Sequence, residues 1–345
     1  MADVGKPGSF LTFNIDDGFA EALVRGMRSG FLGDDDYHHL QRCESIEDVK
    51  LNLQETDYAN FLQNDPSPIL PSVVERRCRE KWVQEFEYLR AGAVQPLASF
   101  LDFIAADYMI DNILLLLKGT LVNPDVDPRR LMERCHPLGR FDDATMKSIC
   151  AFENSARGYA ELYSTVLVDT PVGRYFEAYL QEQMAKRVVE GAGDVRSVLE
   201  EVPISTLENT LKKLYLEDFY AFCVSLGGRT AEVMGEVLSA RADAVTISVT
   251  LNSFHTFYNA PSQRGSSRRA LYPAFGRLYP DGVDALSKVD DEDGVGRVLD
   301  KYPEYRRMWE EAPVEADDGL GVGGGVGGGG GGYGPTAAQL LTERR

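Results

Sequence analysis

Apolar residues recur at helical spacing from residue 96 to residue 121, in the string PLASFLDFIAADYMIDNILLLLKGTL. They cover most of the circumference of a helix, and Asp107, Asp111 and Lys118 fall within about 40° of one another on the remainder. We expect these three residues to form a narrow polar seam along an otherwise buried helix. A helix of this length could cross a bilayer, but the charges along it disfavour a membrane span. The pattern predicts the central helix of a soluble helical protein.

Two stretches have the pattern of two helices joined by a short turn. In residues 73–119, the apolar positions Val74, Cys78, Trp82, Phe86 and Leu89 precede the string described above. In residues 208–254, one helical pattern ends at Gly227-Gly228 and a second one follows. The β-branched residues 245–250 favour a strand locally, but the similarity of this stretch to the first favours a helix. Both stretches are therefore predicted to be antiparallel helical hairpins.

The two hairpins and the segments between them repeat one another. Asp243 holds the place in the second hairpin that Asp111 holds in the first, so Asp243 joins the expected polar seam. Gly139-Arg140-Phe141 and Gly276-Arg277-Leu278 match in the same way. The intervening modules span residues 37–62, 129–176 and 268–309. Such repetition is typical of one unit used several times, each copy burying its apolar face against the next. The predicted fold is all-α, with pseudo-three-fold repeated helical hairpins.

The two ends of the chain differ from this pattern. Residues 1–12 are expected to be a mobile N-terminus, and residues 13–312 a single helical repeat domain. Residues 313–345 contain an almost pure glycine segment, which favours a disordered tail because glycine cannot build a core. The spacing GxGxxG occurs in this tail, but without the strand and helix that a nucleotide site needs.

The net charge of the chain argues against certain kinds of binding partner. With 54 acidic and 36 basic residues, the formal net charge is −18. This balance argues against binding nucleic acid or an anionic lipid surface, because both require cationic patches. The five cysteines are widely spaced, and the opening residues MADVGKPGSF lack an apolar signal region. These features predict reduced thiols in the cytosol.

The sequence predicts no catalytic, cofactor or metal site. The motifs GxxxxGK(S/T), GxSxG and HExxH are absent, and four histidines leave little for acid–base chemistry near neutral pH. His136 could be a ligand or a general base, but packing or capping is favoured because no second ligand is suitably spaced. Asp34–Asp36 could hold a metal together with His38 and His39, but the start of a helix explains them better.

Two further charged clusters have simple interpretations. Asp290–Asp293 has the pattern of a solvated helix start. Arg264, Arg268 and Arg269 are expected to be solvated, with a contact to a partner protein as the alternative. Taken from its residues alone, the chain is predicted to be a helical repeat protein that functions by binding.

Several long strings, in the same order, resemble a known family. They are LVRGMRSGFL (23–32), LQETDYANFL (53–62), the 96–121 string, CHPLGRF (135–141), the ELY…LVDTP segment (161–171), FGRLYPDG (275–282) and YPEY (302–305). These strings resemble the subunit d family of eukaryotic vacuolar-type proton-pumping ATPases, which has a counterpart in archaeal-type ATP synthases. The resemblance extends from about residue 13 to about residue 311.

The resemblance implies an all-helical, three-fold pseudo-repeated funnel, held peripherally by protein contacts on the cytosolic face of vacuolar or endosomal-type membranes. Its implied partners are the proteolipid ring, the central-stalk subunits and the large membrane subunit of the same ATPase. Members of that family cap the ring, receive the foot of the stalk and transmit rotation. They carry out no catalysis and need no cofactor.

The sequence departs from the family pattern in two places. Residues 181–203 form a longer segment, which we expect to be a surface insertion. The family also ends in a further Phe-rich helical unit, where this chain has polyglycine, so we expect the third hairpin of the funnel to be missing. The alternative function is therefore a truncated or regulatory helical scaffold that does not complete the pump.

Overall fold

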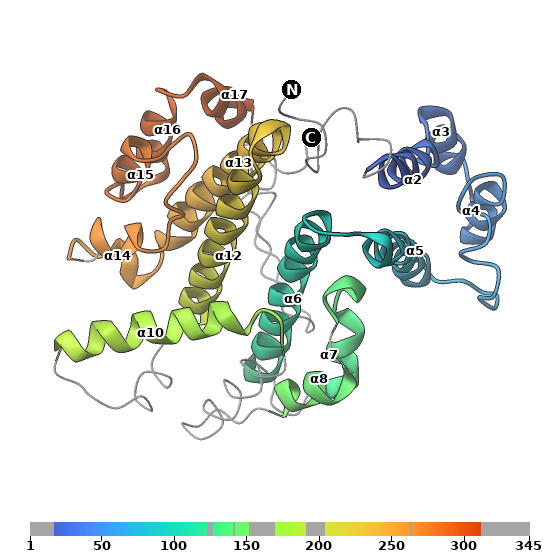
Figure 1. The fold of residues 1–345 in the computed structure, drawn as a ribbon, viewed down its shortest axis with the longest axis horizontal. Helices are drawn as coiled ribbons and strands as arrows, with labels where there is room; N and C mark the ends of the chain where they lie inside the picture. The colour runs from blue at the N-terminus through green and yellow to red at the C-terminus, as the bar shows by residue number, and fades with distance from the viewer. Residues whose placement is uncertain are drawn as a thin grey trace, which may run out of the picture. The chain divides into compact units, whose positions relative to one another are not determined.

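The computed structural model describes residues 17–122, 127–140, 142–151, 170–190, 204–262 and 264–311. Every regular element within these ranges is a helix, which confirms the predicted all-α class (Figure 1). No helix among the described residues is both long and apolar enough to cross a membrane. The expected mobile N-terminus, residues 191–203 of the expected insertion and the glycine-rich tail lie outside the described ranges.

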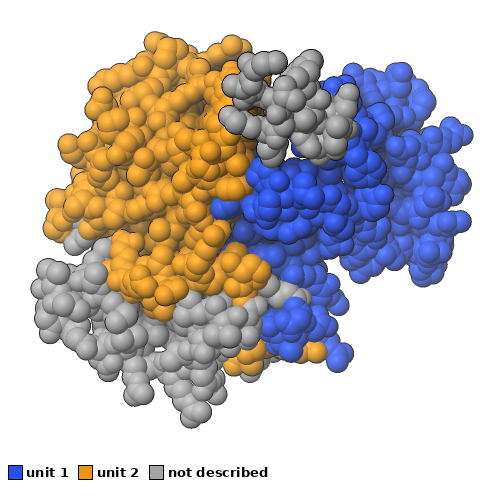
Figure 2. Space-filling view, viewed as in Figure 1, with its two compact units in different colours: residues 1–116, 125–146 blue, residues 117–124, 147–345 orange. Residues whose placement is uncertain are grey.

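The chain divides into two compact units, which Figure 2 colours separately. Unit 1 contains residues 1–116 and 125–146, and unit 2 contains residues 117–124 and 147–345. The single repeat domain expected for residues 13–312 stays a prediction.

Among the described residues of the first part of the chain, three short helices precede two long ones, and three further short helices follow them. In order they are α2 (Gly18–Ser29), α3 (Asp34–Gln41), α4 (Ile46–Leu53), α5 (Pro71–Gly92), α6 (Leu97–Val122), α7 (Pro128–Arg134), the 3-10 helix η1 (Pro137–Gly139) and α8 (Asp143–Cys150). Local chemistry sets several of their starts. The Ser45 hydroxyl accepts a hydrogen bond from the Asp48 N–H at 3.2 Å, and the Asp48 carboxylate accepts one from the Ser45 N–H at 3.0 Å. Pro71 begins α5, at a position where a backbone N–H has no partner within the helix.

The second part of the chain has the opposite order, with long helices first. These are α10 (Gly173–Glu190), α12 (Ile204–Leu226), α13 (Gly228–Ser253), η2 (Phe257–Asn259), α14 (Ser266–Arg269), α15 (Asp281–Leu286), α16 (Glu292–Leu299) and α17 (Pro303–Glu311). The Asp291 carboxylate accepts a hydrogen bond from the Gly294 N–H at 2.7 Å at the start of α16. This confirms the interpretation of Asp290–Asp293 as a helix start.

Helices α12 and α13 lie side by side and form the most extensive helix pairing among the described residues (Figure 1). Residues 245–250 lie within α13, so their interpretation as helix rather than strand is confirmed. The hydroxyls of Thr246 and Thr250 donate to carbonyls one helical turn earlier, at 2.9 and 2.7 Å. Both side chains can therefore be fully buried in a helix without an unpaired donor.

Helices α5 and α6 are both present as predicted, but they do not pack along one another as α12 and α13 do. They approach each other where the rings of Trp82 and Tyr108 lie 5.6 Å apart between centroids. The Arg90 guanidinium also pairs with the Asp102 carboxylate at 2.7 and 2.9 Å. The interpretation of the two helix pairs as copies of one unit stays a prediction.

An apolar core in unit 2 joins the C-terminal short helices to α13. Its buried members are Ile247, Val249, Leu271, Tyr272, Leu278, Val283, Leu286, Val295, Leu299 and Tyr305. Because α15, α16 and α17 are each short, burial against this shared core supplies stability that such helices lack by themselves.

The expectation of a solvated arginine cluster is wrong for Arg268, which is fully buried. Its guanidinium donates to the Val289 carbonyl at 2.5 Å and to Asn259 Oδ1 at 3.0 Å, and it lies 5.6 Å from the centroid of the Phe254 ring. Burial lowers the pKa of Arg268. Neighbouring oxygen atoms therefore take the place of solvent around its two terminal nitrogens and an aromatic face lies nearby, whereas Nε is buried without a hydrogen-bond partner among the described residues.

The two other arginines of the cluster are paired with carboxylates. Arg264 lies 2.9 Å from an Asp290 oxygen, and Arg269 contacts Asp284. The sequence could not separate these three residues, because all three carry the same charge and only tertiary packing buries Arg268.

Candidate functional site

A buried carboxylate connects α13 to the C-terminal segments of unit 2. The Asp243 side chain is fully buried and accepts three hydrogen bonds. The donors are the Arg277 N–H at 2.9 Å, the Leu278 N–H at 3.1 Å and the Tyr305 hydroxyl at 2.5 Å. We call Asp243, Gly276, Arg277, Leu278 and Tyr305 the α13 node.

The glycine of the α13 node allows this close approach. Gly276 has a φ of 117°, and a Cβ atom built on it would lie 2.3 Å from Asp243 Oδ1. Any larger residue would therefore meet both backbone strain and a collision. Burial raises the pKa of Asp243, whereas its hydrogen bonds act in the opposite direction. The node thus fixes a loop and helix α17 to one point on α13.

A second buried polar group connects α6 to the segment that follows α7 in unit 1. Asn112 is 2% exposed, and its amide makes two hydrogen bonds with the backbone of His136. Nδ2 donates to the His136 carbonyl at 2.9 Å, and Oδ1 accepts from the His136 N–H at 2.8 Å. A Cβ atom on Gly139 would lie 2.3 Å from the carbonyl carbon of Tyr108. We call Asn112, His136 and Gly139 the α6 node.

Aromatic rings cover the α6 node. The His136 ring stacks on Tyr108 with centroids 4.2 Å apart, and it meets Trp82 edge-on at 5.5 Å. His136 Nδ1 accepts a hydrogen bond from the Leu138 N–H at 3.3 Å, so His136 caps η1. This confirms its interpretation as a packing and capping residue. Because Nδ1 accepts this hydrogen bond, it carries no proton. Burial disfavours the charged form of the ring and lowers the pKa of His136.

The predicted seam residues lie in different environments. On α6, Asp107 is half-buried and Asp111 and Lys118 are exposed, whereas Ile110, Ile113 and Leu117 are buried. Lys118 Nζ lies 2.6 Å from a Glu208 oxygen of α12. Asp243, the fourth residue, is fully buried. Whether these residues act together as a seam stays a prediction.

The glycine contacts indicate which residues of α6 and α13 lie in similar places. Gly139 lies against the backbone of Tyr108, and Gly276 lies against Ser239, whose carbonyl oxygen would be 3.4 Å from an added Cβ. The residue one turn after Tyr108 is Asn112, and the residue one turn after Ser239 is Asp243. By these contacts Asn112 of α6 holds the place that Asp243 holds on α13, whereas the pairing of Asp111 with Asp243 in the sequence stays a prediction.

The structure also places the residues considered for a metal. Asp34 begins α3, and the Asp36 carboxylate accepts a hydrogen bond from the Gly33 N–H at 2.8 Å, as expected for a helix start. Among the described residues, no group of three His, Cys, Asp or Glu side chains is arranged to hold a metal ion.

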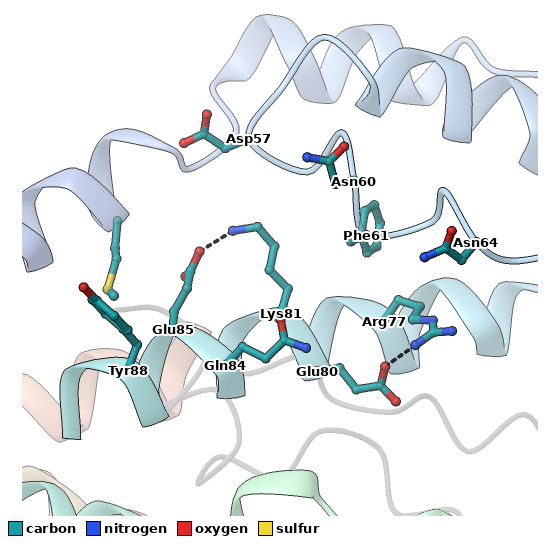
Figure 3. Close-up of a pocket in the computed structure, with 11 residues that line it drawn as sticks. Asp57, Asn60, Phe61, Asn64, Arg77, Glu80, Lys81, Gln84, Glu85 and Tyr88 are labelled. Carbon is teal, nitrogen blue, oxygen red and sulfur yellow. Dashed lines mark hydrogen bonds and ion pairs between the residues drawn. The ribbon is translucent and has the colours of Figure 1, made fainter. Parts of the chain in front are cut away.

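A groove of about 500 Å³ in unit 1 is the third feature that could serve a binding function. Figure 3 shows residues of α5 facing residues 57–64 across it. Its lining residues are Met27, Asp57, Asn60, Phe61, Asn64, Arg77, Glu80, Lys81, Gln84, Glu85 and Tyr88. The sequence pattern did not indicate this groove, because it forms between segments whose individual patterns predict only helices and turns.

The described residues thus form an all-α protein in which buried polar nodes fix loops to the long helices α6 and α13. The chain belongs to the ATP synthase (C/AC39) subunit family, whose family model matches residues 20–321. This confirms the family resemblance carried by the strings of the sequence.

Relatives from three distant organisms support this assignment. The chain is 41% identical over 299 residues to the probable V-type proton ATPase subunit d of Oryza sativa subsp. japonica, covering 87% of this chain and 78% of the relative. It is 39% identical over 306 residues to the V-type proton ATPase subunit d of Dictyostelium discoideum, covering 89% and 79%. It is 35% identical over 305 residues to the V-type proton ATPase subunit d of Saccharomyces cerevisiae, covering 88% and 81%.

Proposed function

We propose that this chain is a non-catalytic subunit of a vacuolar-type proton-transporting ATPase. It couples rotation of the central stalk to the proteolipid ring and so contributes to proton translocation and organelle acidification. The observation that carries the proposal is the family match over residues 20–321, together with relatives that are named V-type proton ATPase subunit d.

The internal structure of the units supports a mechanical role. A part that transmits torque has to keep its shape under load. Fully hydrogen-bonded buried polar groups favour one arrangement of a core, because any other arrangement leaves donors unpaired in a medium without water. The α6 node and the α13 node each fix a loop to a long helix in this way.

The proposed partners are the proteolipid ring, the central-stalk subunits and the large membrane subunit. The proposed location is the cytosolic face of vacuolar or endosomal-type membranes, with the chain peripheral to the bilayer. The net charge of −18 supports attachment through proteins, because an anionic lipid surface would repel the chain. A funnel built from pseudo-three-fold repeats is the arrangement that we propose for this role.

The proposal is tested in Saccharomyces cerevisiae cells that lack their own subunit d. A tagged form of the full chain is expressed there, and the vacuolar membranes are solubilised in detergent. We expect the tag to recover proteolipid and central-stalk subunits, and isolated vesicles to acidify when ATP is added. Cells that express their own subunit d from the same promoter are the positive control.

The outcomes separate the two functions considered. Recovery of the ATPase subunits together with acidification supports the coupling role. Recovery without acidification favours the alternative, a regulatory helical scaffold that does not complete the pump. If the chain is stably expressed and recovers neither the ring nor the stalk, the proposal is wrong.

A further inference from the structure

The groove in unit 1 runs along one side of α5. Its floor consists of α5 side chains from Arg77 to Tyr88, and its opposite wall of residues 57–64 (Figure 3). Met27 of α2 also lines it. A volume of about 500 Å³ is within the range of sites that hold small ligands or the side chains of a bound peptide.

Both cations that line the groove are already paired with acidic side chains. Arg77 binds the Asp65 carboxylate through two hydrogen bonds, at 2.9 and 3.0 Å, and Glu80 through a third at 2.7 Å. Lys81 pairs with Glu85 and lies 4.7 Å from the centroid of the Tyr58 ring. Arg77 and Lys81 are also half-buried, so neither cation is presented to an incoming ligand.

The exposed part of the lining has the opposite character. Asp57, Asn60, Asn64, Gln84 and Tyr88 are all exposed, and each carries an oxygen that can accept a hydrogen bond. Asp57 carries the negative charge of this group, and the two groove cations are bound by other carboxylates. The groove therefore offers acceptors and one available carboxylate to a ligand.

The position of Asp57 is set by its surroundings. A Cβ atom at Gly30 would lie 2.1 Å from Asp57 Oδ2, so this carboxylate packs directly against the backbone at the end of α2. The Thr56 hydroxyl donates to the Leu53 carbonyl at 2.7 Å and accepts from the Tyr58 N–H at 3.1 Å. These contacts hold the turn that carries Asp57, so the carboxylate is held in place before any ligand arrives.

An aromatic side chain completes the groove. Tyr88 is 61% exposed and lies at the far end of the lining on α5. An exposed aromatic face suits the methylene stem of a lysine or arginine and attracts its positive charge. The acidic charge of the whole chain adds a long-range attraction for a basic partner.

We propose that this groove binds a basic peptide segment of a partner protein. One lysine or arginine of the segment lies along Tyr88 and pairs with Asp57, and Asn60, Asn64 and Gln84 accept hydrogen bonds from its backbone or neighbouring side chains. The proposal concerns a surface of unit 1 alone and does not depend on the proposed role in an ATPase.

Binding is measured on the purified full chain with three fluorescein-labelled ten-residue probes, alternating Lys-Ala, Glu-Ala and Ser-Ala. We expect saturable binding of the Lys-Ala peptide and none of the other two at the same concentrations. Asp57→Asn is expected to lower the affinity for the Lys-Ala peptide by about threefold to tenfold at low salt, which is the range expected for a partly exposed ion pair. Tyr88→Ala is expected to lower the same affinity by about twofold to fivefold.

The matched control is Glu87→Gln. Glu87 is an exposed residue of α5 that does not line the groove, and its replacement removes the same charge as Asp57→Asn. The affinity of this variant for the Lys-Ala peptide should stay within twofold of that of the unchanged chain, because an isolated surface charge contributes about 1 kcal/mol or less. Gly30→Ala is a second variant, which leaves the net charge unchanged but displaces the Asp57 carboxylate, and it should also weaken binding.

Three outcomes would overturn the proposal. Equal loss in Asp57→Asn and Glu87→Gln would mean that the peptide binds the general negative field rather than the groove. Tighter binding of spermine than of the Lys-Ala peptide, sensitive to Asp57→Asn, would assign the site to a small polyamine. A dimer in sedimentation experiments that Asp57→Asn or Tyr88→Ala dissociates would assign the groove to a second copy of the chain.

Discussion

The α6 node and the α13 node solve the same packing problem with different chemistry. In each, a glycine comes so close to a long helix that no Cβ atom fits, and a buried polar side chain of that helix binds the adjoining loop. On α6 the polar side chain is the neutral amide of Asn112. On α13 it is the carboxylate of Asp243.

The hydrogen-bond partners explain this difference. Asn112 faces one carbonyl and one N–H of the same residue, so it must donate and accept at once. Asp243 faces two N–H groups and one hydroxyl, so it needs only to accept. An amide fits the first set of partners and a carboxylate the second. Asn and Asp are therefore not interchangeable at these two positions, although their shapes are nearly identical.

The largest expected effect is that of Asp243→Leu. It would leave two backbone N–H groups and a hydroxyl buried without an acceptor, and we expect a loss of about 3–5 kcal/mol in the free energy of unfolding. Denaturant unfolding followed by circular dichroism measures it. Glu236→Leu, at an exposed position of the same helix, is the control and should stay within about 0.5 kcal/mol. Equal effects of the two substitutions would contradict the hydrogen bonds assigned to the α13 node.

The next effect is that of Gly139→Ala, which should lower the free energy of unfolding by about 2–3 kcal/mol. Its Cβ atom would meet the backbone of α6, which cannot rotate away as a side chain can. Gly235→Ala is the control within α13, where a Cβ atom has nothing within 4 Å. That control should raise stability by up to about 1 kcal/mol, because alanine favours helix over glycine. A neutral Gly139→Ala would contradict the close packing of the α6 node.

A reciprocal exchange sharpens the comparison further. Asn112→Asp would set a carboxylate oxygen against the His136 carbonyl, and Asp243→Asn would set an amide N–H₂ against a backbone N–H. We expect each to lose about 1–3 kcal/mol of stability by the same denaturant measurement. Asp243→Asn should be milder than Asp243→Leu, because its amide oxygen can still accept from the Arg277 N–H and the Tyr305 hydroxyl. If either exchange leaves stability unchanged, the assignment of donors and acceptors is wrong.

The smallest expected effect is a pH dependence confined to the α6 node. Burial, and secondarily the charge of Arg79, lower the pKa of His136 from 6.5, while Asp111 raises it. Because the folded state favours the neutral ring, its contribution to stability is complete above the unfolded pKa of about 6.5 and declines as the pH falls below it. The thermal midpoint should therefore drop more between pH 7.5 and pH 5.5 in the unchanged chain than in His136→Gln. Parallel profiles would show that His136 does not titrate as expected.

Much of the fold followed from local patterns. The all-α class, the helix over residues 96–121 and the capping role of His136 all depend on helical periodicity, turn residues or the lack of a second ligand nearby. The helix over residues 245–250 was inferred from repetition against its own β-branched composition, and the structure confirms it because burial and hydroxyl bonds to the preceding turn outweigh local propensity. Charge and long matching strings were sufficient to indicate the family.

What the sequence by itself determined, then, is which segments are helices and which family they belong to, because periodicity and residue type act over a few neighbouring positions. The tertiary structure decided which polar residues turn inward. Asn112 lies about 100° around the helix from Asp111, and only the approach of Gly139 selects it for burial. In the same way, burial of Arg268 depends on carbonyls of residues 258 and 289, and the α5 groove depends on residues 57–64 lying opposite α5. Contacts between residues far apart in the sequence leave no periodic signal, so they could be identified only from the folded chain.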